Sequence, residues 1–145
     1  SAYGLTTHRH TPEIEQELSQ MAGGNIQVVF SPHLMPMTRG ILATVYINLQ
    51  QEVEAEKVLD HFKEFYAAEP FVRVLPLGRF ANTHQVARSN YCDIAIAVDK
   101  RTRRLIVTSA IDNLMKGASS QAIQNANVMF DFPETMGLES APVFP

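Results

Sequence analysis

The chain has 145 residues, of which 46% are hydrophobic and 19% charged, and its formal net charge is -3. This length fits one ordinary domain with its own core, and no apolar run approaches the roughly 18 residues that cross a bilayer. The single cysteine excludes an internal disulfide, and the one basic cluster, residues 100–104, is too short for a nucleic-acid-binding surface. Composition therefore predicts one globular domain over residues 1–145, in cytoplasmic or organellar solution by default.

The first predicted element is a helix that follows two closely spaced histidines. Thr11 is expected to cap this helix and Pro12 to be its first residue, because both types are favoured at these positions. Gly23 and Gly24 are expected to end it. A short strand over 26–30 should follow.

The clearest pattern in the chain lies after a proline-broken loop over 31–40. Five apolar residues of 41–49 share one parity, while Thr44, Tyr46 and Asn48 take the other, which predicts a strand with one buried face. The residues expected on the buried face are Ile41, Ala43, Val45, Ile47 and Leu49.

The remaining elements mix helices and strands without strict alternation. In chain order they are a helix between 52 and 68, strands over 71–75, 91–98 and 104–109, a helix over 118–129, and an extended tail over 131–145. The basic turn is expected to join the last two strands as a hairpin. This order favours an α+β fold with a mostly antiparallel sheet and helices packed on one face.

No nucleophile or nucleotide-binding motif is present in the chain. Cys92 shares its parity with Ile94 and Ile96, so we expect a core cysteine rather than a reactive thiol. Neither GxGxxG nor GxxxxGK[ST] occurs, and no His or Cys pair has a familiar zinc spacing. No metal site is predicted.

The two histidines, His8 and His10, are the first candidates for catalysis. In an extended segment, residues at i and i+2 project to the same side, so both rings can face one pocket. The positive end of the following helix disfavours an imidazolium at His10 and favours a neutral ring. The alternative is that both are surface loop residues or capping residues.

Two further stretches carry candidates for anion binding. In "FSPHLMPMTRGI", Arg39 can hold a phosphate or carboxylate through its planar fork, or it can pair with an acidic residue at the surface. In "DNLMKGASSQAIQNAN", Lys116 and the free amides over 117–119 can face an anion at a helix start, or the segment can be a simple cap.

Four segments in order, "AYGLTTHRHTPEIEQ", "FSPHLMPMTRGILATVY", "SNYCDI" and "DNLMKGASSQAIQNAN", resemble the C-terminal, substrate-binding domain of N-acetyl-gamma-glutamyl-phosphate reductases. The resemblance implies a glyceraldehyde-3-phosphate-dehydrogenase-like C-terminal domain from an NADP-dependent enzyme of arginine biosynthesis. It also implies that a Rossmann domain with the nucleophilic cysteine precedes Ser1, which makes this chain a fragment that is inactive alone. Pairing through the sheet as a homo-dimer or tetramer is the implied assembly.

The resemblance also implies roles for individual residues. Catalytic roles fall to His8, His10 and Glu13. One histidine, with His8 favoured over His10, would activate the thiol and later protonate the thiohemiacetal oxygen, and Glu13 would orient or tune it. In substrate binding, Arg9 and Arg39 would hold the phosphate and carboxylate, with His33 and Pro36 shaping the loop. Residues expected near the nicotinamide or the domain interface are Asn113, Lys116, Gly117 and Gln121. The substrate carries an acetyl group or a carrier-protein cap.

Two other classes of function remain open from the residues alone. A non-catalytic binding or oligomerisation module that shares the fold would have freely replaceable histidines. A metal-dependent hydrolase built on the histidine pair would carry stoichiometric zinc.

Overall fold

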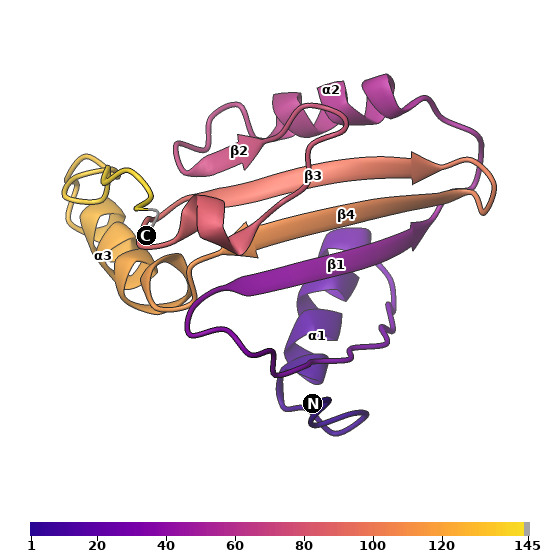
Figure 1. Cartoon of the computed structure of the whole chain (residues 1–145), viewed down its shortest axis with the longest axis horizontal. Helices are drawn as coiled ribbons and strands as arrows, with labels where there is room; N and C mark the ends of the chain where they lie inside the picture. Colours follow the sequence, from indigo (N-terminus) through magenta and orange to yellow (C-terminus); the bar gives the residue numbers. More distant parts are fainter. Residues whose placement is uncertain (144–145) are drawn as a thin grey trace. The chain divides into compact units, whose positions relative to one another are not determined.

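The computed structural model describes residues 1–143, which fall into two compact units, 1–37 and a second that begins at Thr38 (Figure 1). The first unit holds one helix, α1 (His10–Ala22). As predicted, this helix ends at Gly23, which adopts a left-handed conformation with φ of 66°. None of the helices in residues 1–143 combines the length and the apolarity needed to cross a membrane.

The start of α1 differs from the prediction. Arg9 occupies the cap position, and Thr11 lies inside the helix without a capping hydrogen bond. The His8 ring takes the capping role instead, since its Nδ1 accepts from the amide of His10 at 3.2 Å. The predicted cap at Thr11 is therefore wrong, because a ring nitrogen satisfies the first helical donor earlier in the chain.

The strand predicted over 26–30 is also absent, because side chains of α1 take the place of a partner strand. The amide of Ile26 donates to Ser19 Oγ at 2.8 Å, and the amide of Val28 donates to Glu15 Oε1 at 3.0 Å. These hydrogen bonds hold the segment without a sheet.

The second unit is built on a four-stranded sheet with the order β1-β4-β3-β2 (Figure 1). Its strands are β1 (Ile41–Asn48), β2 (Val72–Val74), β3 (Cys92–Asp99) and β4 (Arg104–Ile111). The pairs β1–β4 and β3–β4 are antiparallel, while β2 is parallel to β3. The predicted α+β fold and the hairpin at the basic turn are confirmed.

Helical segments cover the β2–β3 side of the sheet and one end of β4. Helix α2 (Ala55–Phe65) lies along β2 and β3, where Leu59 packs with Ile96 and Leu105 (Figure 1). The short helix η1 (Thr83–Val86) packs through Val86 against Ala110, whose side chain points to the opposite face by strand alternation. A π-helical turn η2 (Met115–Ser119) leads into α3 (Ser120–Met129), close to the predicted final helix.

The apolar face predicted for β1 is exposed rather than buried. Strand β1 lies at one edge of the sheet, whereas α2 packs on the same face near the other edge, over β2 and β3. The side chains of Ile41, Val45 and Ile47 are 46%, 49% and 42% exposed. The prediction of a buried face is therefore wrong for the chain by itself.

The segment after α3 is folded rather than extended. Turns occupy 134–138, and Asn127 Nδ2 donates to the carbonyls of Glu134 and Met136 at 3.1 and 3.0 Å. Leu138 is buried as a result of this return. The predicted extended tail is wrong over the described part, and residues 144–145 lie outside the described residues.

Gly40, which separates Arg39 from β1, provides a test of this packing. Its φ is 114°, and a Cβ at this position would lie 2.7 Å from the Cβ of Thr83. Gly40→Ala should lower the free energy of unfolding by about 1–3 kcal/mol or more, because it combines backbone strain with a clash. Chemical denaturation measures this loss.

Gly78→Ala is the matched control, because Gly78 also has a positive φ of 79° but nothing within 4 Å of its Cβ position. Thr83→Ala should recover part of the loss in the Gly40→Ala background. Equal losses for the two glycine variants would contradict the clash at Gly40.

Candidate functional site

The rings of His8 and His10 lie close together, through a turn rather than the predicted extended segment. The two ring centroids are 5.0 Å apart, and residues 4–9 form turns that lead directly into α1. The His8 ring also contacts Phe30 edge-on at 5.1 Å and Tyr3 at 5.4 Å. Aromatic neighbours and the start of the helix therefore hold His8 in place.

Hydrogen bonding distinguishes the two rings. Because Nδ1 of His8 accepts the amide of His10, a neutral His8 ring carries its proton on Nε2. His10 is exposed, and its Nε2 lies 3.9 Å from Glu13 Oε2 in the first turn of α1. The pair thus presents one ring fixed as a donor at Nε2 and one ring beside a carboxylate.

Gly4 is a part of this site that sequence reasoning missed. Its φ is 56°, and a Cβ at this position would lie 3.1 Å from Cδ2 of His8. The only feature of the sequence that could have indicated this role is the glycine itself, which precedes the two histidines in a turn. Its close approach shows that the backbone itself forms one wall beside the His8 ring.

The other predicted residues of the first unit are less constrained. Arg9 is exposed at the helix cap, and Pro36 is exposed in the loop. The backbone of His33 pairs with Ala2, and its Nδ1 lies 3.0 Å from the carbonyl of Ser31. The structure brings none of these three side chains into a described contact with the histidine pair.

Arg39, in the second unit, is paired with a buried carboxylate. Its Nε lies 3.0 Å from Oδ2 of Asp112, and its Nη2 donates to Oδ1 at 3.2 Å. Asp112 is fully buried, whereas the Arg39 side chain is 31% exposed. Asp112 was not predicted as a site residue. Only its place before Asn113, at the start of the segment "DNLMKGASSQAIQNAN", could have indicated it.

Asp112 also accepts hydrogen bonds from three backbone amides. They belong to Arg88 at 2.6 Å, Leu114 at 2.8 Å and Met115 at 3.0 Å. Burial raises the pKa of Asp112, but these amides and Arg39 outweigh burial and hold the pKa below its ordinary value. The ionised carboxylate is therefore the stable form in the fold.

The amides predicted to face an anion at the start of the last helix are already used. Gly117 donates its amide to the carbonyl of Asp112 at 2.9 Å, and Ser119 donates to Leu114 at 3.0 Å. The prediction of free amides there is wrong, because the π-helical turn η2 closes these hydrogen bonds within the chain.

The remaining residues predicted near a cofactor make contacts inside the second unit. Asn113 Oδ1 accepts the amide of Gly40 at 2.8 Å. Lys116 Nζ donates to Gln124 and lies 5.6 Å from the ring centroid of Phe71. Gln121 is exposed and accepts from Asn125 at 2.9 Å.

Cys92 is half-buried and belongs to neither core cluster, so the predicted core position is only partly met. Its thiol is free of any disulfide, and burial raises its pKa, with the nearby Asp93 adding to the effect. A raised pKa lowers the thiolate fraction at neutral pH. Cys92 is thus unsuited to act as a nucleophile.

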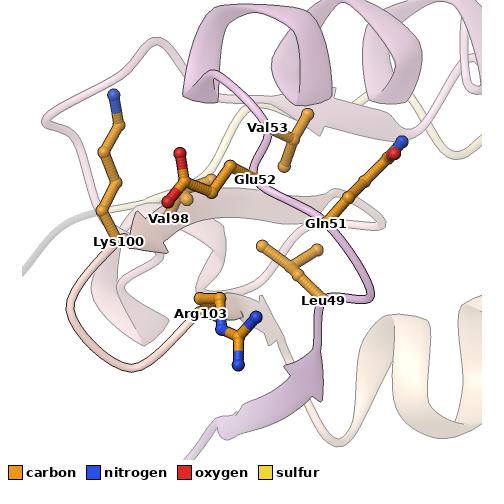
Figure 2. Close-up of a pocket in the computed structure, with 7 residues that line it drawn as sticks. All are labelled: Leu49, Gln51, Glu52, Val53, Val98, Lys100 and Arg103. Carbon is orange, nitrogen blue, oxygen red and sulfur yellow. The ribbon is translucent and has the colours of Figure 1, made fainter.

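The pocket beside the basic turn is too small for a substrate. It holds about 10 Å³, which is the space of a single water molecule. Figure 2 shows its lining residues, which include the apolar Leu49 and Val98 and the basic Lys100 and Arg103. In residues 1–143, no three His, Cys, Asp or Glu side chains gather as ligands for a metal.

A second feature that the sequence did not indicate is the ion pair of Arg73 and Asp93. Arg73 Nε lies 2.6 Å from Asp93 Oδ1, and the guanidinium lies 4.7 Å from the ring centroid of Tyr91. The pair borders an open groove that Leu75, Gln85 and Pro142 also line. Asp93 is buried, so this pair joins β2 to β3 at the floor of the groove.

The fold of this chain is shared with a solved semialdehyde dehydrogenase. It is similar to aspartate semialdehyde dehydrogenase II from Vibrio cholerae, with a TM-score of 0.66 and 16% identity over 85% of this chain and 37% of that chain. Residues 1–113 match the family described as "Semialdehyde dehydrogenase, dimerisation domain". The chain belongs to this family.

More similar relatives confirm the resemblance stated from the sequence. N-acetyl-gamma-glutamyl-phosphate reductases from Symbiobacterium thermophilum, Geobacter metallireducens and Staphylococcus aureus are 60%, 58% and 52% identical to this chain. Each alignment covers 99–100% of this chain. The chain spans 42% of the length of each of these relatives.

Asp112 predicts a specific response to acid. Its pKa in the fold lies below the value of about 3.9 expected for an unfolded chain. Its stabilising effect is therefore complete above that unfolded value and is lost as the pH falls through the lower folded pKa. Asp112→Asn should lower the free energy of unfolding at pH 7 by about 1–3 kcal/mol, because a charged acceptor is removed.

The difference between wild type and Asp112→Asn should shrink as the pH falls from 5 to 2, as measured by urea unfolding at each pH. Asp60→Asn is the control, because Asp60 is an exposed residue of α2. A difference that stays constant over this range would contradict the role of the ionised carboxylate.

Proposed function

We propose that this chain is the substrate-binding and dimerisation half of an NADPH-dependent reductase of arginine biosynthesis in the cytoplasm. The reaction converts N-acetyl-glutamyl 5-phosphate to N-acetyl-glutamate 5-semialdehyde and phosphate. The observation that carries the proposal is the 52–60% identity to reductases of this name along the whole chain.

A second domain supplies the parts that this chain lacks. Because the relatives are longer than the chain, we place a Rossmann domain with the nucleophilic cysteine and the main NADP site in the remaining part of the protein. When bound there, NADPH supplies the hydride that reduces the acyl group. Cys92 does not replace the missing thiol, since burial raises its pKa.

The histidine pair moves the protons of this reaction. One ring accepts the proton of the attacking thiol, and one returns a proton to the oxygen that becomes negatively charged during reduction. The Nε2–H of a neutral His8 suits the second task, because Nδ1 is occupied by the amide of His10. His10, beside Glu13, then suits the first task, with Glu13 orienting the ring.

Arginine side chains are the candidates for binding the anionic groups of the substrate. Arg9 is exposed at the start of α1, and Arg39 keeps an edge of its guanidinium that Asp112 does not occupy. A guanidinium edge matches a carboxylate or phosphate through two parallel hydrogen bonds. His33 and Pro36 shape the loop that carries Arg39.

The segment from Asn113 onward borders the cofactor domain rather than forming the cofactor site. The donor and acceptor groups of Asn113, Lys116 and Gly117 are engaged within the chain, so they are suited to positioning the segment. Gln121 is exposed and is the residue of this group best placed to reach another domain.

The exposed apolar residues of β1 form the surface through which two copies pair, in a homo-dimer or in each half of a tetramer. An edge strand with exposed apolar side chains on both faces is unusual for a chain that functions alone. The family is described by dimerisation, which agrees with this use of the sheet.

The first test measures reductase activity of the full-length gene product that contains these residues. NADP- and phosphate-dependent oxidation of N-acetyl-glutamate semialdehyde is the assay. His8→Ala and His10→Ala should each lower kcat by about 100- to 10,000-fold, because each removes a proton-transfer group. The 145 residues alone should have no activity.

His61→Ala and Cys92→Ser serve as matched controls that should keep activity, since His61 is exposed on α2 and Cys92 lies in the sheet. No activity from the intact gene product would refute the reductase and leave a binding or oligomerisation module as the explanation.

The second test addresses pairing through β1. Val45→Lys places a charge on the exposed apolar face and should shift the protein from dimer to monomer in analytical ultracentrifugation. Lys57→Glu, on the exposed side of α2, is the control for a charge change. An unchanged sedimentation coefficient for Val45→Lys would contradict this interface.

A further inference from the structure

Asp112 connects more segments than any role as a helix cap requires. Its two oxygens accept from the amides of Leu114 and Met115 at the start of η2, and from the amide of Arg88 in the loop after η1. They also face the guanidinium of Arg39, which precedes β1 in the chain. One fully buried carboxylate thus joins three separate segments.

Arg39 and Asp112 form an ion pair with one hydrogen bond. Nη2 donates to Oδ1 at 3.2 Å, and Nε lies 3.0 Å from Oδ2 without hydrogen-bond geometry, so the edge of the guanidinium that carries Nε and Nη2 faces the carboxylate. The neighbouring residues repeat this link, because the amide of Gly40 donates to Oδ1 of Asn113 at 2.8 Å. Residues 39 and 40 are therefore both held by residues 112 and 113.

The pair leaves the other edge of the guanidinium for a second anion. Nη1 takes no part in the contacts with Asp112, and the side chain is 31% exposed. A guanidinium can serve two carboxylates or phosphates at once, since its five N–H groups lie in one plane. Fixing one edge sets the direction of the other and removes the entropy of a free arginine side chain.

We propose that Asp112 is a positioning residue that orients Arg39 toward the anionic group of the substrate. The proposal rests on the proposed function, in which Arg39 binds that group. Asp112 makes no contact with the substrate and acts through Arg39. The anionic group is either the carboxylate of the amino-acid substrate or the phosphate.

The test is a double-mutant cycle in the full-length enzyme, with KM measured separately for the semialdehyde, inorganic phosphate and NADP. Asp112→Asn should raise KM for the semialdehyde or for phosphate by roughly 10- to 100-fold, because a charge-assisted contact is misplaced. The KM for NADP should change less than threefold. A rise for the semialdehyde assigns the carboxylate, and a rise for phosphate assigns the phosphoryl group.

Coupling to Arg39 separates positioning from general stability. If Asp112 acts through Arg39, the Asp112→Asn effect on KM should vanish in an Arg39→Gln background. The same fold-change in both backgrounds, or an equal rise in KM for NADP, would overturn the proposal. Thermal unfolding of each variant identifies those that fail to fold.

A second variant keeps the test decisive if Asp112→Asn does not fold. Asp112→Glu keeps the charge and moves the oxygens by one methylene group, and it should raise the same KM in an Arg39-dependent way. Wild-type enzyme without activity would refute the proposed function itself. Active wild-type enzyme with an unchanged KM in Asp112→Glu would refute only the positioning role.

Discussion

The buried carboxylate of Asp112 is the constraint on which the second unit depends most. A charge without access to water is costly, and here the cost is offset by three backbone amides and the guanidinium of Arg39. These donors come from different parts of the chain, so the carboxylate is satisfied only when the segments meet. The end of β4, the loop after η1 and the entry to β1 are therefore set together.

Helix packing covers only part of the sheet of the second unit. Helix α2 covers the side of β2 and β3, while β1 keeps exposed apolar residues such as Val45 and Tyr46, on opposite faces. Exposed apolar area at a sheet edge favours association, because burying it removes it from water. The same strand begins after Gly40, so the surface proposed for pairing and the segment of Arg39 are continuous in the chain.

Side chains of the first unit form the hydrogen bonds that hold its helix and the segment after it. The ring of His8 completes the start of α1, and Glu15 and Ser19 hold the following segment in place of a partner strand. A histidine that serves as a cap has its tautomer set by the backbone. The hydrogen bond that completes the start of α1 thus also sets the tautomer on which the proposed proton transfer depends.

Periodicity and turn residues in the sequence determined the α+β class, the end of α1 at Gly23 and the hairpin at the basic turn, because these depend on local patterns. The resemblance indicated the family and the candidate residues. Tertiary structure alone decided that the segment over 26–30 is no strand, that the face of β1 is exposed, and that Asp112 holds Arg39. Each of these outcomes depends on partners distant in the chain, which local spacing cannot reveal.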